Sequence, residues 1–406
     1  MASTQFKNLV KKLQNSYPTM VGDKESGTIK WARIKSPQVS YMMGGGIPTG
    51  RVIRFRGPSS AGKSAFCNYI AGNLQQECPK LYDNPNKKIL IYVDFERTFE
   101  TRFAETVGVL TDEDHFLHLR PRSIEELSDI LMPLVETGDV AAIIFDSDAS
   151  APTKASWVDE SGKATFGGQA KAISEFIRKY NIACADTGTT LLWISQERVN
   201  MKFGAHLPAV TGGEALPYYC SIICRITKSD DIKGPGDEGI IGIEMRVRNY
   251  KNKCSVPFRD AEGLKLYYKG GFDAKSEFID FFIKFGIINQ AGAYFKFELN
   301  GESYSLQGRK KLEEFLDTHP DVEKEWQERV YNSISGYCAV LDSENIAVDE
   351  DTGAALNEKD KERYNKYLEE TNKKAIEYSD EKRNKLVDEA IAQAEKDEAE
   401  EEKEEK

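Results

Sequence analysis

The sequence predicts an α/β fold with a mostly parallel, twisted sheet, and three features support this prediction. Six apolar runs of strand length recur between residues 52 and 247, helical patterns separate several of them, and a glycine-rich loop joins the first run to the first helix. Strands that are apolar throughout are buried on both faces, which is typical of parallel sheets covered by helices. With 406 residues, the chain has room for one large domain and smaller additions.

The expected elements begin with a short amphipathic helix over residues 3–15, which has apolar side chains along one face. An isolated helix of this length is marginal in water, so we expect it to pack against another surface, such as a neighbouring subunit. The strands of the sheet are expected at Val52–Phe55, Ile89–Val93, Val140–Phe145, Thr190–Ile194, Ser221–Ile226 and Ile241–Val247. The helices between them are expected at 64–78, 124–137 and 168–187.

Gly270-Gly271 marks a boundary, because the pattern beyond it changes to a small α+β arrangement. We expect a helix over 275–286 and then a hairpin within 291–306 that turns at Asn300-Gly301. Helices follow at 307–318 and 321–335. The predicted domains are an N-terminal oligomerisation helix with its linker (1–35), an α/β core (36–270), a small C-terminal α+β domain (271–341) and a largely disordered acidic tail (342–406).

The charge of the chain is unevenly distributed. Residues 342–406 contain 23 acidic and 12 basic side chains, so they account for the whole net charge of −11, and residues 1–341 are balanced. The acidic tail is expected to repel nucleic acid, whereas the globular part has no net charge that would do so.

The composition excludes several classes of protein. The chain has no apolar run of 18 residues and no apolar signal core near its start, so neither a membrane span nor secretion is expected. Its seven cysteines form no CxxC pair and its four histidines are scattered, which argues against a disulfide framework, a zinc site or a His-rich metal cluster. A cytoplasmic location is therefore expected.

A motif of the form GxxxxGK[ST] follows the strand VIRFR and opens the helix at 64–78. Its glycines allow backbone N–H groups to surround phosphate oxygens, and the helix N-terminus adds partial positive charge. We expect Lys63 to reach the β- and γ-phosphates of a nucleotide and Ser64 to ligate Mg²⁺. A chance glycine turn is the competing interpretation. The predicted nucleotide-binding residues of this segment are Gly57, Pro58, Ser59, Ser60, Ala61, Gly62, Lys63, Ser64 and Ala65.

Polar side chains follow three of the predicted strands, at the sheet edge where a ligand binds. Asp146 ends the run AAIIF and is the predicted Mg²⁺ carboxylate, with Asp148 as the alternative. Glu96 lies just past ILIYVDF and is the candidate that activates water, with Asp94 as its competitor. Gln196 follows LLWIS and is placed to sense the γ-phosphate. An ordinary strand-terminal acid, a surface ion pair and a loop hydrogen bond are the alternative interpretations.

The segment 197–213 is long, mixed in polarity and ends in glycines. Met201 and Phe203 lie among basic residues there, and exposed apolar side chains of this kind wedge between or stack on bases. The alternative interpretation is an ordinary surface loop.

The order and spacing of these motifs resemble the RecA family of homologous recombinases over roughly residues 40–335. The resemblance rests on GGGIPTGRVIRFRGPSSAGKS (44–64), IYVDFERTFETRFAETVGV (91–109), DSDASAPTK (146–154), ISQERVNMKFG with TGGEALPYYCS (194–221), RVRNYKNKCSVPF (246–258) and AGAYFKFELNGE. It implies a RecA-like P-loop ATPase core that uses ATP and Mg²⁺.

The resemblance also implies roles for individual residues. Glu96 matches the catalytic glutamate, Phe103 the aromatic ring that stacks on adenine, and Glu100 a residue near the adenine. Lys251 and Lys253 match two lysines that reach the ATP of the neighbouring subunit.

The DNA-binding residues implied by the resemblance belong to two loops and the helix after the first loop. Lys171, Arg178 and Arg198 are expected to contact the DNA backbone, with little sequence preference. The remaining members of the set are Met201, Phe203, Gly212 and Gly213. The first loop (154–168) shares little with the bacterial pattern, and Lys171 replaces a common Arg, which suggests a divergent, phage-encoded member.

The residues and the resemblance together predict a DNA-dependent ATPase that forms a helical filament on single-stranded DNA and catalyses homologous pairing and strand exchange in recombination and repair. The expected partners are single-stranded DNA, homologous duplex, further copies of the chain, a single-strand-binding protein and a loading mediator. A hexameric RecA-fold helicase is the alternative, but such enzymes lack the turn that is formed here by Lys251, Asn252 and Lys253. A non-catalytic mediator would have lost Glu96 or Lys63, and both are present.

Overall fold

The computed structural model describes residues 9–12, 28–155, 168–199, 208–210, 215–236, 239–255 and 259–342. The chain divides into two units, Met1–Tyr331 and Asn332–Lys406. Of the helix expected at 3–15, only residues 9–12 are described, and they are helical. The tail beyond Asp342 lies outside the described residues.

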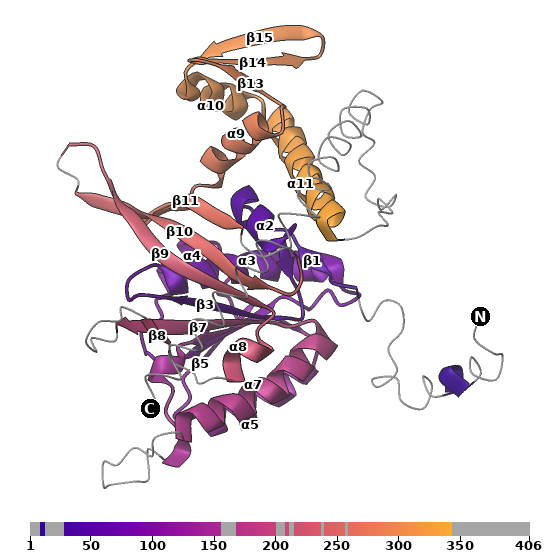
Figure 1. Ribbon diagram of the computed structural model, residues 1–406, viewed down its shortest axis with the longest axis vertical. Helices are drawn as coiled ribbons and strands as arrows, with labels where there is room; N and C mark the ends of the chain where they lie inside the picture. Colours follow the sequence, from indigo (N-terminus) through magenta and orange to yellow (C-terminus); the bar gives the residue numbers. More distant parts are fainter. Residues whose placement is uncertain are drawn as a thin grey trace, which may run out of the picture. The chain divides into compact units, whose positions relative to one another are not determined.

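A ten-stranded sheet lies at the centre of the first unit (Figure 1). Six of its strands run parallel, in the spatial order β9-β3-β7-β6-β4-β5. They are β3 (Val52–Gly57), β4 (Ile89–Asp94), β5 (Phe116–Leu119), β6 (Val140–Asp146), β7 (Thr190–Val199) and β9 (Ile222–Lys233). Five of these strands coincide with predicted ones, so the α/β class and the mostly parallel sheet are confirmed.

The sheet continues beyond β9 in antiparallel order, through β10 (Ile240–Asn252), β11 (Asp260–Tyr267) and β12 (Gly271–Phe272). A short strand, β8 (Pro208–Val210), pairs antiparallel with the end of β7. Strand β11 was not predicted from the sequence, because DAEGLKLY mixes charged and apolar residues and buries only Ala261, Leu264 and Leu266. The sheet is therefore mixed, with its parallel part built as expected.

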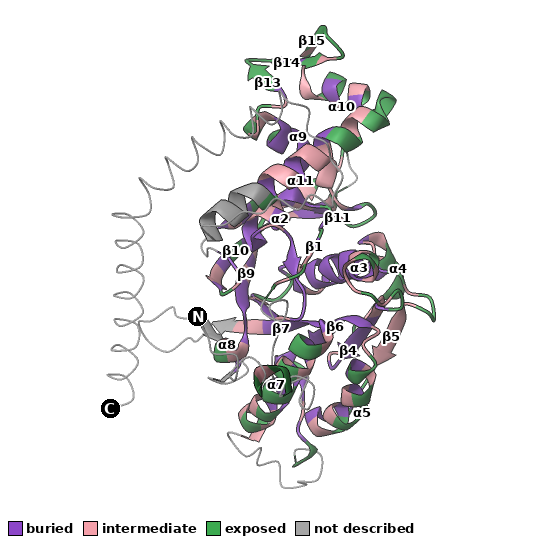
Figure 2. Ribbon diagram, turned by 90° about the vertical axis from the view of Figure 1, so that its right-hand side faces the viewer, coloured by how far each residue is buried: buried purple, intermediate pink, exposed green. Residues whose placement is uncertain are grey.

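Helices cover both faces of the parallel strands, and alternate strand residues face opposite layers. On one face, Ile53 and Phe55 pack into the cluster that includes α3 (Lys63–Leu81). On the other, Val52 packs into the cluster with α5 (Ile124–Glu136) and α7 (Gly168–Thr187). Figure 2 shows α3 buried along most of its length, whereas α5 and α7 expose their outer faces. The three predicted helices of the core are thus present.

Shorter elements complete the core. They are β1 (Trp31–Ala32), α2 (Pro37–Met43), β2 (Ile47–Pro48), α4 (Thr101–Thr106), the 3₁₀ turn η1 (Asp148–Ser150) and α8 (Ala215–Tyr219). Helix α2 has strong end signals, with Ser36 accepting from the Val39 amide and Gly44 closing it in the left-handed region at φ 114°. These elements are too short to produce a periodic pattern, and none of them was predicted.

The residues after the core form α9 (Ala274–Lys284), β13 (Asn289–Ala291), β14 (Tyr294–Leu299), β15 (Glu302–Gln307), α10 (Arg309–Thr318) and α11 (Pro320–Asp342). The predicted hairpin turn is confirmed, because Asn300 and Gly301 have φ angles of 52° and 83° between paired β14 and β15. An aromatic cluster that includes Phe297 and Trp326 joins the sheet to the helices. The Tyr331 hydroxyl donates to the Ile34 carbonyl at 3.0 Å, so this region is tied to the first segment of the chain.

Candidate nucleotide site

The glycine-rich loop turns tightly between β3 and α3. A Cβ at Gly57 would lie 2.1 Å from the Ile226 carbonyl oxygen of β9, so only glycine fits there. Gly62 has φ 85° and is the N-cap of α3, which places Lys63 and Ser64 in the first helical turn. The loop therefore presents backbone amides and a helix N-terminus to one cavity, as phosphate binding requires.

Lys63 lies across the loop, and its Nζ donates to the carbonyls of Gly57 at 3.1 Å and Pro58 at 2.7 Å. Burial lowers the pKa of Lys63, and the neighbouring carboxylates of Asp146 and Glu96 oppose the shift. A buried ammonium held mainly by carbonyls is well placed to bind an anion such as phosphate.

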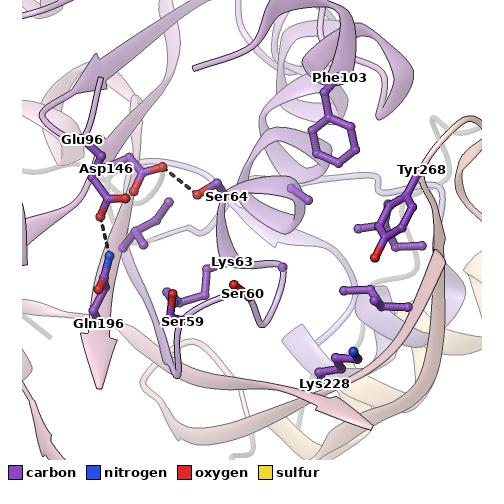
Figure 3. Close-up of a pocket in the computed structure, with 15 residues that line it drawn as sticks. Ser59, Ser60, Lys63, Ser64, Glu96, Phe103, Asp146, Gln196, Lys228 and Tyr268 are labelled. Carbon is purple, nitrogen blue, oxygen red and sulfur yellow. Dashed lines mark hydrogen bonds between the residues drawn. The ribbon is translucent and has the colours of Figure 1, made fainter. Parts of the chain in front are cut away.

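The cavity beside the loop has a volume of about 390 Å³ (Figure 3). Its lining combines loop residues with side chains from the ends of several strands. The lining residues are Ser59, Ser60, Gly62, Lys63, Ser64, Ala65, Glu96, Phe103, Asp146, Ile194, Gln196, Lys228, Ile243, Leu266 and Tyr268. The structure thus brings together predicted residues from four separate segments of the chain.

Asp146 is the carboxylate nearest to the helix N-terminus. Its Oδ2 accepts from Ser64 Oγ at 2.7 Å and from the Tyr92 hydroxyl at 2.6 Å. Burial raises the pKa of Asp146 to about 6, although these two hydrogen bonds act to lower it. A carboxylate and a hydroxyl at the phosphate end of the cavity are hard oxygen donors of the kind that Mg²⁺ prefers. Ser64 and Asp146 therefore fit this ion.

Asp148, the alternative metal carboxylate, is buried elsewhere. Its Oδ2 accepts from Trp193 Nε1 at 3.0 Å and from Ser195 Oγ at 2.5 Å, while Arg54 Nε donates to the same Ser195 oxygen at 2.8 Å. It does not line the cavity. Asp146 is the last residue of β6, so its side chain still follows the alternation of the strand. Asp148 lies beyond the strand, in the 3₁₀ turn η1, and its side chain points elsewhere.

Glu96 lies next to Gln196 on one side of the cavity (Figure 3). Its Oε1 accepts from Gln196 Nε2 at 2.6 Å and from Ser147 Oγ at 2.5 Å. Asp94, the competitor of Glu96, instead accepts the Thr98 amide at 3.2 Å, contacts His118 Nε2 at 3.1 Å and is not among the lining residues. Of the two acids, Glu96 is the one available to water in the cavity.

Aromatic side chains lie at the other end of the cavity. Figure 3 shows Phe103 from α4 and Tyr268, just after β11, on the side of the P-loop away from Glu96. The Glu100 carboxylate is the N-cap of α4, accepting the Arg102 and Phe103 amides at 3.1 and 2.6 Å, and it does not line the cavity.

Tyr268 and Lys228 were missed by the sequence analysis. Lys228 lies in the part of β9 that pairs antiparallel with β10, and Tyr268 directly follows β11. Lys228 forms an ion pair with Asp231 at 2.5 Å. Neither residue is part of a local motif, and each reaches the cavity only because β9, β10 and β11 pair beside β3. Because β11 was not predicted, nothing in the sequence indicated that Tyr268 lies at the cavity.

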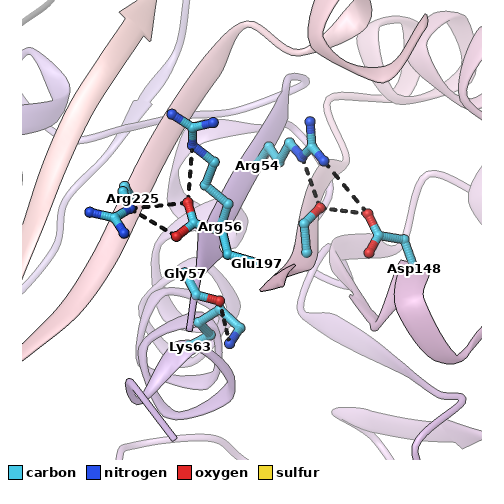
Figure 4. A network of polar contacts seen from close by, with 8 residues as sticks. Arg54, Arg56, Gly57, Lys63, Asp148, Glu197 and Arg225 are labelled. Carbon is cyan, nitrogen blue, oxygen red and sulfur yellow. Dashed lines mark hydrogen bonds and ion pairs between the residues drawn. The ribbon is translucent and has the colours of Figure 1, made fainter. Parts of the chain in front are cut away.

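Two arginines and a glutamate hold the strand that carries Gln196 (Figure 4). The Glu197 side chain is 4% exposed and accepts from Arg225 Nε at 3.0 and 2.9 Å, with Arg56 Nε at 3.6 Å. Together with the Arg54–Ser195–Asp148 contacts, this network joins β3, β7 and β9 beside the start of the P-loop. None of these polar contacts was predicted.

Lys251 and Lys253 lie near the end of β10, away from the cavity lining. Their Nζ atoms donate to the carbonyls of Pro217 at 2.5 Å and Tyr218 at 3.0 Å, in α8. Burial and the neighbouring Lys253 charge lower the pKa of Lys251. The structure therefore does not bring these lysines to the nucleotide cavity of their own chain.

Lys171 and Arg178 are both exposed on α7, seven positions apart and hence on one face of the helix. Arg198 belongs to β7, and its side chain is not described. Met201, Phe203, Gly212 and Gly213 lie outside the described residues.

Comparison with known families matches residues 3–273 to the RecA N-terminal domain. The chain belongs to the RecA family. RecA of Acidothermus cellulolyticus is 32% identical over 288 residues, covering 70% of this chain and 78% of that protein. RecA of Bifidobacterium breve is 30% identical over 313 residues, covering 77% and 74%. RecA of Corynebacterium aurimucosum is 29% identical over 333 residues, covering 81% and 84%.

Membership of the RecA family confirms the resemblance noted in the sequence and the RecA-like P-loop fold. RecA-family proteins are DNA-dependent ATPases of recombination and repair, so this chain is an ATP-binding, RecA-type recombination protein. Among the described residues, no helix is both long and apolar enough to cross a membrane.

Proposed function

We propose that this RecA-family chain is a single-strand-stimulated, Mg²⁺-dependent ATPase that assembles into a helical filament on single-stranded DNA and exchanges strands with homologous duplex. The observation that carries the proposal is the contact of Gln196 with Glu96 at 2.6 Å. Gln196 lies on β7, immediately before the segment proposed to bind DNA, and Glu96 lines the nucleotide cavity. A single hydrogen bond therefore connects the two proposed sites, which favours coupling between nucleotide and DNA.

The proposed chemistry divides among the residues of the cavity. The P-loop amides and Lys63 bind the phosphates, Phe103 and Tyr268 flank the base, and Glu96 orients the attacking water and accepts its proton. A Mg²⁺ ion held by Ser64 and Asp146 would supply positive charge to the phosphate oxygens. Hydrogen bonds from Gln196 and Ser147 hold the Glu96 carboxylate in place for this task.

Lys251 and Lys253 are proposed to complete the site of a neighbouring subunit. Their absence from the cavity lining of their own chain and the lowered pKa of Lys251 support this proposal, because two close cations are stabilised by an anion brought from outside. Positive charge supplied across an interface to a γ-phosphate acts as an arginine finger does.

Changing Lys251 and Lys253 together to alanine is expected to leave ATP binding by isolated subunits intact and to lower DNA-stimulated hydrolysis at least about 10³-fold, the lower end of the effect of such a charge. Mixing these subunits with Lys63→Ala subunits should partly restore hydrolysis, since each supplies what the other lacks. The control is the Lys310→Ala/Lys311→Ala pair, two exposed lysines of α10, which should behave as wild type. No restoration at any mixing ratio would refute a shared site.

The test of the function itself is ATP hydrolysis with and without single-stranded DNA, followed by negative-stain microscopy with a non-hydrolysable nucleotide. The proposal expects stimulation by DNA and filaments. Closed rings would instead favour a hexameric helicase. A single-strand-binding protein, a loading mediator and a bacterial cytoplasmic location stay parts of the proposal, supported by the bacterial relatives only at the level of the family. A phage-encoded origin is also proposed, and it rests on the divergent first loop and on Lys171.

Removing the residues after Asp342 is expected to strengthen DNA binding, especially to duplex. The tail carries almost all of the net charge of −11, and its acids oppose the approach of phosphates. The gain should be largest at low salt and shrink as salt rises, because the Debye length falls from about 30 Å at 0.01 M to about 10 Å at 0.1 M. Titrations of both forms on labelled single and double strands at two salt levels measure this.

A tail of equal length with serine in place of both its acidic and its basic residues is the control for length. Equal affinity of the full and shortened chains at every salt concentration would show that the tail does not compete with DNA.

A further inference from the structure

Tyr92 is a buried residue of β4 for which the sequence predicted no role. It is 2% exposed, and its hydroxyl donates to Asp146 Oδ2 at 2.6 Å. The same oxygen accepts from Ser64 Oγ at 2.7 Å. One carboxylate oxygen is thus held from two directions, by the helix N-terminus and by the neighbouring strand.

The position of this hydroxyl follows from strand register. Asp94 of β4 pairs with Asp146 of β6, so Tyr92, two residues earlier, points to the same face of the sheet. That face is covered by α3, which carries Ser64. The chain therefore brings a donor from β4 to the carboxylate at the end of β6.

The Tyr92 ring is fixed by its surroundings. It packs in the core cluster with α3, and its centroid lies 4.5 Å from that of Phe99. Because the ring has no free space, the direction of its O–H group is set by packing.

We propose that Tyr92 is a positioning residue that orients the Asp146 carboxylate toward a divalent cation held together with Ser64. The inference rests on the proposed function only in that the cavity binds a metal–nucleotide complex. Hydrogen bonds to metal-binding carboxylates fix their orientation, and losing one typically costs about 10- to 100-fold in metal affinity or activity. If Asp146 served only as a hydrogen-bond partner for the buried Tyr92 hydroxyl, removing that hydroxyl would not change the metal affinity.

The test is Mg²⁺-dependent binding of a fluorescent, non-hydrolysable ATP analogue to the full-length protein without DNA. Tyr92→Phe is expected to raise the Mg²⁺ concentration at half-saturation about 10-fold. At saturating Mg²⁺ the affinity for the analogue should return to the wild-type value, which also shows that the variant is folded. A Mn²⁺ titration followed by electron paramagnetic resonance reports the metal directly and should shift in the same direction.

Tyr180→Phe is the matched control. Its phenol is also buried and donates to a backbone carbonyl, that of Ser128 at 3.0 Å, on the sheet face with α5 and α7. Removing that hydroxyl should leave the Mg²⁺ midpoint unchanged even if it lowers the melting temperature. A change in stability is thereby separated from a change in metal binding.

A variant with 4-aminophenylalanine at position 92 keeps the ring and places a weaker N–H donor at the same point. Its Mg²⁺ midpoint should lie between those of wild type and Tyr92→Phe, and it tests the direction of the effect even if the phenylalanine variant does not fold. A midpoint equal to that of wild type in either variant would overturn the proposal. The Mg²⁺ titration contains no DNA. Its result is therefore independent of whether the protein forms filaments on DNA in a separate experiment.

Discussion

Lys63→Ala is expected to abolish ATP hydrolysis and to weaken nucleotide binding strongly. Lys63 is the one lysine of the P-loop segment 57–65. Its Nζ contacts the carbonyls of Gly57 and Pro58 at the N-terminus of α3. A hydrogen bond to a charged group contributes about 1.5–3 kcal/mol, so binding alone should weaken about 10- to 150-fold. The loss in hydrolysis should be larger, at least about 10²-fold, because charge on the phosphates grows as the reaction proceeds.

Lys80→Ala is the control for this experiment. Lys80 lies in the last turn of the same helix, is exposed and pairs only with Glu77 among the described contacts. Its removal should change neither binding of a fluorescent ATP analogue nor steady-state hydrolysis. Near-normal turnover by Lys63→Ala would refute the assignment of the nucleotide site.

Glu96→Gln is expected to retain ATP and DNA binding but to lose turnover by about 10²- to 10⁴-fold, the usual contribution of a general base. In the wild type, Gln196 Nε2 and Ser147 Oγ donate to Glu96 Oε1 at 2.6 and 2.5 Å. A glutamine side-chain carbonyl can accept the same two hydrogen bonds, so nucleotide binding should be retained. Only the ability to take a proton is removed. Filaments of this variant should persist longer on single-stranded DNA, if hydrolysis drives their disassembly.

The exposed Glu113→Gln change is the control, because it removes the same charge at a residue that does not line the cavity. Single-turnover hydrolysis and DNA binding are measured for both variants. Hydrolysis by Glu96→Gln within about threefold of wild type would mean that another group is the base, and Asp94→Asn would then be the next variant to test.

The local chemistry of this chain was predictable from its sequence. The P-loop needs glycines at fixed spacing between a strand and a helix, and those constraints lie within a few residues of one another. Five of the six parallel strands were found for a similar reason, since burial on both faces leaves an unbroken apolar run. The Asn300-Gly301 turn was predictable because positive φ angles select those residues.

The contacts that complete the cavity depend on long-range pairing. Asp146 rather than Asp148 lines it, because the chain leaves β6 at Asp146 and turns Asp148 toward Trp193 and Ser195. Tyr268 reaches it only through β11, a strand whose alternating sequence carries too weak a signal.

Tyr92 illustrates the same limit. In the sequence it is one more apolar residue of a buried strand, and its hydroxyl gains a partner only when β4 pairs with β6 beneath α3. A motif records constraints between near neighbours, whereas hydrogen bonds between strands arise from register, and register is set by the packing of the whole sheet.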